Sequence, residues 1–402
     1  MGSEAQPEAH YEGVMTGLLV SPASPHWTVV HSAVRVCRRP LPVGRLRGMN
    51  SPTTRTERPT LKIQSPHDAV SAVPYLLGFH PADSLVAIGF DGPGATCALR
   101  LDLPRPGTAD LPHGLAEHVS DLLARNGFRQ ALLLGYGAPE RVTPLIDASR
   151  QVLAARGITV REALRVADGR WWSYLCQEPA CCPPEGTAYD ISSSVVAAEA
   201  TLAGHVAYAD RAELQRTVAP LTGPARQAMR EATDRAEARF LLWAAGGLQP
   251  AQIRERMVEE AVPLIAGLTA RAAGADPPSD DEIAWLGVLL TDLRVRDEAW
   301  VRMNADDPAA DIAFWRDVLR RVEDPYAAAP ACLLAYAAYT NGDGGLANVA
   351  LDRALATDPA YSLAGILREV IDAGIPPSKA RLSLTPEELA AAYAEQDQNP
   401  PP

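Results

Sequence analysis

The sequence predicts an α/β domain with a mixed sheet, followed by an all-α domain. Up to about residue 175, short apolar runs alternate with amphipathic segments and with Asp-Gly and Gly-Pro turns, as in hairpins interleaved with strand–helix units. From about Ser194, alanine-rich amphipathic segments follow one another, separated by proline and glycine. A length of 402 residues is sufficient for two cores.

Regular structure is expected from Leu61. Ser65-Pro66-His67-Asp68 predicts a helix start, because serine is a favoured N-cap, proline suits the first position and an acid at the third completes a capping box. Gly78 should end this helix, and Pro74 should kink or break it. The segments expected next are a loop over 79–84, strands Leu85–Phe90 and Ala95–Leu103, helix Leu111–Arg125, strand Gln130–Gly135, helix Pro139–Ala155, and strands Ile158–Ala167 and Arg170–Leu175 joined by an Asp-Gly turn.

The second half contains only helical patterns. The expected helices are Val195–Tyr208, Arg211–Ala219, Ala225–Ala245, Pro250–Ala273, Asp281–Leu290, Arg296–Met303, Ala309–Arg321, Pro330–Thr340, Leu346–Ala356 and Tyr361–Ala373. The last three include a stretch that resembles one tetratricopeptide (TPR-like) repeat, with Ala335, Ala347, Leu351 and Ala354 at its packing positions and Pro359 at its end. A plain antiparallel helix pair that closes a bundle is the alternative.

These patterns divide the chain into four parts. Residues 1–60 are rich in Pro, Gly and Ser without a sustained period, which predicts a disordered extension, or a mis-annotated one upstream of a natural start at Met49. The α/β domain is expected at 61–190, the α-helical domain at 191–395, and a tail at 396–402.

Composition excludes several classes of partner. Hydrophobic residues at 47% and charged residues at 21% are ordinary for a globular protein. The net charge of −12 argues against nucleic acid, because phosphate binding needs clustered positive charge. No run of eighteen apolar residues and no secretory signal is seen, so we expect a cytoplasmic protein without a membrane partner.

Three of the six cysteines lie close together, as Cys176, Cys181 and Cys182. Thiolates of this kind bind zinc, which needs a fourth ligand from elsewhere. The candidates for that ligand are Cys97, His80, His113, His118 and His205. A reactive or disulfide-forming pair and ordinary buried thiols are the alternatives, so the sequence makes zinc possible without selecting it.

The aromatic run beside these cysteines predicts a ligand or partner surface. On a strand, Trp172 and Tyr174 share one face and Trp171 lies on the other, so a large aromatic remains if only one face is core. Arg170 would clamp a carboxylate or phosphate, or pair with a nearby acid. His80 and Asp83 complete the candidate surface. They form no catalytic triad with Ser84, because all three are crowded before a strand, and locking the loop is the favoured role for Asp83.

Two segments resemble a known family. Ser65-Pro-His-Asp-Ala-Val-Ser-Ala-Val-Pro-Tyr-Leu-Leu-Gly-Phe-His-Pro-Ala-Asp-Ser84 is similar to the opening signature of an actinobacterial family known only as a domain of unknown function. Asp168-Gly-Arg-Trp-Trp-Ser-Tyr174 with Cys181-Cys-Pro-Pro-Glu-Gly186 resembles its second signature. The resemblance extends over roughly residues 61–376 and implies a cytosolic protein with no established activity.

No complete catalytic constellation is seen, which argues against an enzyme. We therefore expect a non-catalytic protein-interaction or regulatory module whose helical domain binds a protein partner. The alternative is an enzyme or small-ligand sensor with a pocket at the domain junction, near the Trp/Cys segment. The sequence places that segment where the strand-rich part meets the helical part.

Overall fold

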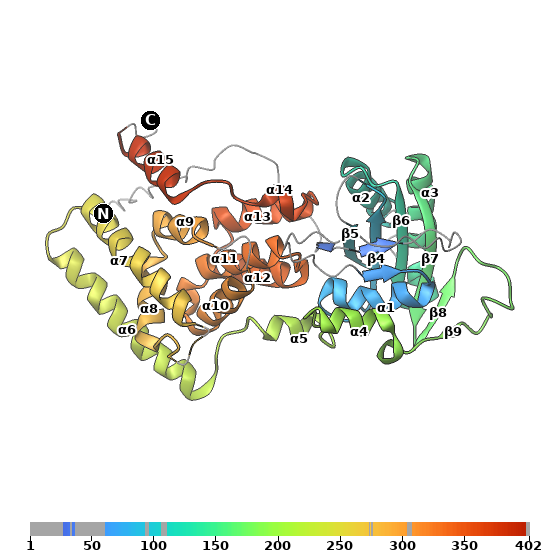
Figure 1. Cartoon of the computed structure of the whole chain (residues 1–402), viewed down its shortest axis with the longest axis horizontal. Helices are drawn as coiled ribbons and strands as arrows, with labels where there is room; N and C mark the ends of the chain where they lie inside the picture. Colours follow the sequence, from blue (N-terminus) through green and yellow to red (C-terminus); the bar gives the residue numbers. More distant parts are fainter. Residues whose placement is uncertain are drawn as a thin grey trace, which may run out of the picture.

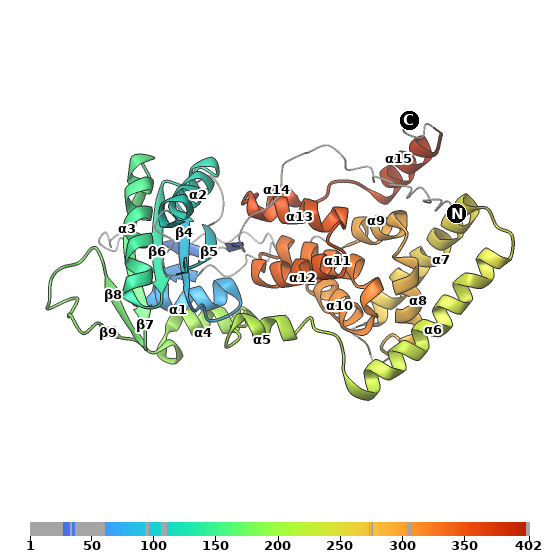
Figure 2. The same ribbon diagram turned by 180° about the vertical axis from the view of Figure 1, so that it is seen from behind.

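A computed structural model describes residues 27–32, 34–36, 61–92, 96–105, 111–272, 274, 276–303 and 308–398. A mixed sheet with its helices forms one end of the molecule, and helices alone form the other (Figures 1 and 2). This arrangement confirms the predicted α/β part followed by a helical part. No helix in the described ranges is long and apolar enough to cross a membrane.

The main sheet has seven strands in the order β1-β5-β4-β6-β7-β8-β9. All described neighbours in it are antiparallel except β6 and β7, which are parallel. The strands are β1 Trp27–Ser32, β4 Ser84–Phe90, β5 Thr96–Asp102, β6 Gln130–Tyr136, β7 Thr159–Ala167, β8 Arg170–Ser173 and β9 Thr187–Ala188, and a small second sheet pairs β2 Val34–Val36 with β3 Leu61–Ile63.

Helices cover both faces of the main sheet. They are α1 Pro66–Leu77, α2 Leu111–Arg125, α3 Pro139–Ala155 and α4 Val195–Leu202. On one face α2 and α3 pack so closely that a Cβ on Gly89 would lie 2.5 Å from Leu123, and one on Gly135 would lie 2.2 Å from Val142. On the other face α1 packs on α4. Because α4 packs there, the α/β layers extend beyond the expected boundary at residue 190.

Helix α1 shows how the sequence sets a boundary. The Ser65 hydroxyl accepts a hydrogen bond from the Asp68 amide, and the Asp68 carboxylate accepts one from the Ser65 amide, which completes the expected capping box. Gly78 ends the helix in the left-handed conformation, at φ 81°. The helix continues through Pro74 to Leu77, as expected from the stop at Gly78, so this proline does not break it. Because Pro74 lies so close to the end, it costs one backbone hydrogen bond in a buried, well-packed helix.

The helical part begins after α4. Its elements are α5 Arg211–Arg216, α6 Gly223–Ala245, α7 Pro250–Arg271, α8 Asp280–Leu289, α9 Leu293–Val301, α10 Pro308–Arg321, α11 Ala328–Thr340, α12 Gly344–Thr357, α13 Ser362–Asp372, α14 Pro377–Ala380 and α15 Pro386–Gln398, with short 3-10 helices at Ile191–Ser193 and Asp324–Tyr326. Helices α11 and α12 pack against each other, and every side chain of α11 is buried.

Strand β1 lies between the two parts of the molecule. It pairs with β5 and also packs against α12 and α13. Strands β1 and β2 thus lie within the stretch expected to be a disordered or mis-annotated extension, most of which lies outside the described residues. A run of six residues is too short to show a sustained period, so its strand character follows from the edge of β5 that it completes.

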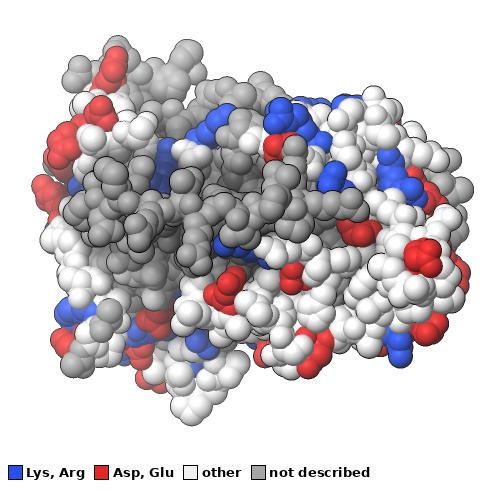
Figure 3. Space-filling model, turned by 45° about the vertical axis from the view of Figure 1, so that its right-hand side comes forward, with Lys and Arg blue, Asp and Glu red and all other residues white. Residues whose placement is uncertain are grey.

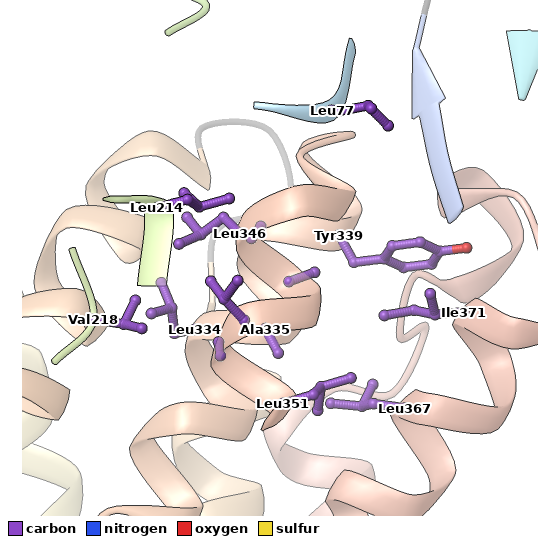
Figure 4. Packing of buried hydrophobic residues seen from close by; sticks show 14 of the residues in the cluster. Leu77, Leu214, Val218, Leu334, Ala335, Tyr339, Leu346, Leu351, Leu367 and Ile371 are labelled. Atoms are coloured by element: carbon purple, nitrogen blue, oxygen red, sulfur yellow. The ribbon is translucent and has the colours of Figure 1, made fainter. Parts of the chain in front are cut away.

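Direct contacts join the two parts around the end of α1. Leu77 of α1 and Leu214 of α5 lie near Leu346 of α12, and Tyr339 of α11 lies beside Ile371 of α13 (Figure 4). The Asn126 side chain also donates a hydrogen bond of 3.3 Å to the Ala373 carbonyl. These contacts lie on the β1 side of the sheet.

The Trp/Cys segment is therefore not at the junction. Strands β8 and β9 form the opposite edge of the sheet, at the far end of the molecule from α6 and α7 (Figures 1 and 2). The Trp/Cys segment lies between the strand-rich and helical parts in the sequence but not in space. The chain adds β8 and β9 to the outer edge of the sheet and then packs α4 against one face of the sheet before it enters the helical part.

Candidate functional site

An arm of the chain, residues 174–186, connects β8 to β9 and carries the three clustered cysteines. We call it the cysteine arm. The position of this arm depends on the turn between β7 and β8, where Asp168 and Gly169 have φ values of 50° and 69°. Two successive positive values define a type I′ turn, as the Asp-Gly pair predicts. The turn brings β8 back antiparallel to β7, so the arm begins beside the middle of β7 and continues toward its start.

Two side chains of β8 bind the C-terminal end of the cysteine arm, just before β9. The Arg170 guanidinium donates a hydrogen bond of 2.8 Å to the Gly186 carbonyl. The Trp172 indole donates one of 3.0 Å to the Pro184 carbonyl, and a Cβ on Gly186 would lie 2.4 Å from its ring. The Arg165 guanidinium carbon also lies over that ring, 3.5 Å from its centroid. Arg170 and Trp172 thus bind their own chain.

The start of the arm is fixed by hydrogen bonds to β7 and α3. The Ser173 hydroxyl accepts hydrogen bonds of 3.0 Å from the amides of Leu175 and Cys176, and donates one of 2.8 Å to Glu162. The Tyr174 hydroxyl is 2.8 Å from that of Thr143 in α3. Both ends of the arm are therefore anchored by named contacts.

The sulfur atoms of Cys176, Cys181 and Cys182 all lie within 4.8 Å of one another. Burial of Cys182 and its hydrogen bonds with the other two thiols raise its pKa to about 12. Hydrogen bonds from Cys182 and from the backbone of Glu178 lower the pKa of Cys176. In this cluster the proton of Cys176 leaves before that of Cys182.

None of the other expected ligands reaches the cluster among the described residues. Cys97 is fully buried in β5, where burial raises its thiol pKa far above the usual range. His113 and His118 lie on α2, and the exposed His205 follows α4. His80 follows α1 and donates its backbone amide to Tyr208 at 2.9 Å. Three thiols are therefore the complete described donor set.

Asp83 also lies away from the cysteine arm. It precedes β4, with φ 44°, and its carboxylate pairs with Arg141 in the first turn of α3. Its carbonyl accepts a hydrogen bond of 2.8 Å from Leu103. These two contacts join the loop before β4 to α3 and to the residue that follows β5. The pairing registers put Asp83 at the carboxyl end of β6, whereas the arm lies near the start of β7.

Trp171 belongs to the core. It is 7% exposed and lies in a row across the sheet with Ser84, Tyr136, Val166 and Thr187. No described protein atom accepts a hydrogen bond from its indole, and the buried hydroxyls of Ser84, Tyr136 and Thr187 also have no described partner. Ordered water normally satisfies such groups. Trp171 is thus no surface anchor, whereas Trp172 and Tyr174 are half-buried.

A groove of about 670 Å³ borders the cysteine arm, and the sequence analysis missed it. It runs between the second half of α3 and the start of β7, with Leu175 of the arm at one end. Its lining consists of Asp147, Arg150, Gln151, Ala154, Gly157, Ile158, Thr159, Val160 and Leu175. We call it the edge groove. No sequence motif predicts this groove, because it is formed by the spacing between α3 and β7.

A second surface missed by the sequence analysis is the outer face of α4. Val195 is 71% exposed, Leu202 is 90% exposed, and Val206, just after the helix, is 59% exposed. Glu199 is also exposed and lies on the same helical face, four residues after Val195 and three before Leu202. The opposite face of α4 is buried against the α/β layers. We call this exposed face the α4 patch.

The visible surface is otherwise mixed in charge. On the face in Figure 3, most of the described surface is uncharged, with small areas of both signs.

Comparison with known proteins gives one match. A family described as a domain of unknown function, DUF4192, matches residues 66–378, which contain the α/β layers from α1 onward, the cysteine arm, the α4 patch and the helices through α13. No curated protein and no solved structure matches the chain.

Proposed function

The chain belongs to the DUF4192 family, and from that premise we propose that it is a non-catalytic protein-interaction module that binds its partner through the α4 patch. The observation that carries the proposal is the exposure of Val195, Leu202 and Val206 within twelve residues. Exposed apolar surface concentrated in one place is typical of interaction sites on soluble proteins. We further infer a cytoplasmic protein of actinobacterial origin, as its sequence suggests.

The charge on the patch selects the partner. In a symmetric pair formed through this face, the two Glu199 carboxylates would approach each other and lose hydration, which is unfavourable. A partner segment with apolar side chains around a lysine or arginine would instead pair with Glu199. The net charge of −12 would also accelerate its approach. We therefore propose a basic, amphipathic helix of another protein as the partner.

The helical part has a supporting role in this proposal. Ala347 is fully buried and Trp300 is 7% exposed, so these two side chains of the helical part offer a partner almost no surface. We propose that the TPR-like α11–α12 pair braces the α/β layers through the contacts between α12 and α1. The α4 patch then sits on a rigid support.

The test places a photo-crosslinking amino acid at position 202, and at position 241 on α6 as the matched control, since Leu241 is also exposed. Crosslinking in the native host should capture a discrete protein from position 202 and not from position 241. The crosslinked site on the captured protein should lie in a basic amphipathic segment. Glu199→Lys should reduce capture at least about tenfold, which corresponds to about 1.4 kcal/mol. Equal capture from both positions, or capture of a second copy of this chain, would contradict the proposal.

A small-ligand sensor is the second candidate. It is favoured by the edge groove, whose volume of about 670 Å³ lies within the range of small-molecule sites. Arg150 and Asp147 would supply its polar contacts, and the neighbouring cysteine arm would respond to the bound molecule. The groove lies beside α3, on the opposite face of the sheet from the α4 patch, so crosslinking from position 202 separates the two candidates.

A further inference from the structure

The contacts of the cysteine arm leave its three thiols as the feature still without a role. Arg170 and Trp172 hold its return, and Ser173 and Tyr174 hold its start. Between these anchors, the amides of Cys181 and Cys182 both donate to the Glu178 carbonyl, at 3.0 and 2.7 Å. This tight turn brings the sulfur atoms of Cys181 and Cys182 close to that of Cys176. Together these contacts hold the segment in which the three sulfur atoms lie close to one another.

The spacing of the sulfur atoms suits a metal ion. In a tetrahedral zinc site with Zn–S distances of about 2.3 Å, two sulfur ligands are about 3.8 Å apart. The three sulfur atoms here lie within 4.8 Å of one another, so a small closure of the arm would bring them to that separation. Thiolates are soft donors that prefer zinc and copper(I) to magnesium or calcium.

We propose that Cys176, Cys181 and Cys182 bind one zinc ion with three thiolates and leave its fourth coordination position open. Cys181 is exposed, so the open position faces solvent. Water or a donor atom from another molecule completes the tetrahedron there. The site goes beyond the proposed interaction through the α4 patch and is independent of it, because the two features lie on different elements.

The arrangement favours a metal over two other uses of these thiols. A disulfide would join only two sulfur atoms, and adjacent cysteines bridge each other only with strain. Inert structural thiols are normally buried in apolar surroundings, as Cys97 and Cys332 are. Cys181 is instead exposed, and Cys176 and Cys182 are partly exposed. Their clustering at an anchored, solvent-facing turn is what a zinc ligand set requires.

The first experiment measures zinc in the full chain, purified under reducing conditions without chelator. We expect about one equivalent of zinc per chain in elemental analysis. Cobalt(II) added to the metal-free protein should give intense visible bands typical of tetrahedral coordination and a near-ultraviolet thiolate charge-transfer band. The double variant Cys181→Ser/Cys182→Ser should lose both signals, whereas the matched control Cys332→Ala, which removes a thiol in α11, should keep them.

A second measurement does not depend on the folding of any variant. In the wild-type protein, zinc should slow alkylation of Cys176, Cys181 and Cys182 at least about tenfold, because a metal-bound thiolate is a poor nucleophile, and chelator should restore the rate. The proposal is overturned if the fully reduced protein binds neither zinc nor cobalt, or if zinc leaves alkylation of the three thiols unchanged. A disulfide among the three in protein kept anaerobic and reducing would also overturn it.

Discussion

Asp372 shows how one residue can make stability depend on pH. It lies in the last turn of α13, where the C-terminal end of the helix dipole already disfavours negative charge. The pKa of its carboxyl is raised to about 6, mainly by burial and in part by the nearby Asp352, while Arg368 opposes the shift. One oxygen of Asp372 is buried without a hydrogen-bond partner among the described residues. The charged form of this side chain is thus poorly accommodated.

The sign of the effect follows from the two pKa values. The folded chain binds the Asp372 proton more tightly than the unfolded chain, whose aspartates titrate near pH 3.9. The free energy of unfolding should therefore fall as pH rises from about 4 to about 6, and the loss is complete above pH 6. Asp372→Asn should remove the loss and stabilise the protein at pH 7.5 by about 1–2 kcal/mol, after allowance for partial solvent exposure.

Urea unfolding at pH 4.5 and pH 7.5 measures this difference. Glu369→Gln is the matched control, since it neutralises an exposed carboxylate of the same helix and should leave the pH dependence as in the wild type. If Asp372→Asn is no more stable than the wild type at pH 7.5, the charged carboxylate costs nothing and the argument from burial fails.

Among elements, the contact between α1 and α12 sets how closely the two parts of the molecule approach. Gly345 lies in the first turn of α12, and a Cβ there would be only 2.0 Å from the Leu77 carbonyl at the end of α1. That oxygen belongs to the backbone, so no side-chain rotation relieves the clash. A glycine at this position lets the two helices pack at their observed distance.

Gly345→Ala should therefore destabilise the protein by about 2 kcal/mol, because overpacking forces the helices apart and outweighs alanine's better helix propensity. Gly365→Ala in α13 is the control: nothing lies within 4 Å of its Cβ, and it should stabilise by up to about 1 kcal/mol. Chemical denaturation of both variants compares them directly. Equal stabilities would show that the contact between α1 and α12 is loose enough to accept a methyl group.

Most helices and strands could be predicted from patterns of neighbouring residues. Contacts between segments that lie far apart in the sequence could not. The cap at Ser65 and the Asp168–Gly169 turn act over four residues or fewer, so the sequence shows them directly. The α4 patch was hidden because α4 has apolar residues on all sides, and only packing decides which face stays open. The three cysteines are close in the sequence, so their clustering could be predicted. Their distance from the domain junction could not, because it depends on the order of the strands in the sheet.

On the scale of the whole molecule, β1 connects the α/β part with the helical part. Its neighbours are β5 on one side and α12 and α13 on another, so it lies between the sheet and the helical part. It precedes the region matched by the family, which begins at residue 66. Without β1, strand β5 would become an edge with unpaired backbone groups, next to uncovered surfaces of two helices.

This position predicts that a chain lacking residues 1–60 is less stable than one lacking residues 1–26, which keeps β1 and β2. The shorter deletion should melt with the full chain, whereas the longer one should melt on the order of 5 °C lower. Amide hydrogen exchange in β5 should also accelerate only in the longer deletion, because β5 loses the partner that β1 provides. Calorimetry and exchange mass spectrometry measure the two effects separately. Should both deletions match the full chain in melting and in β5 protection, β1 would be a dispensable strand, and α12 and α13 would hold the sheet edge by themselves.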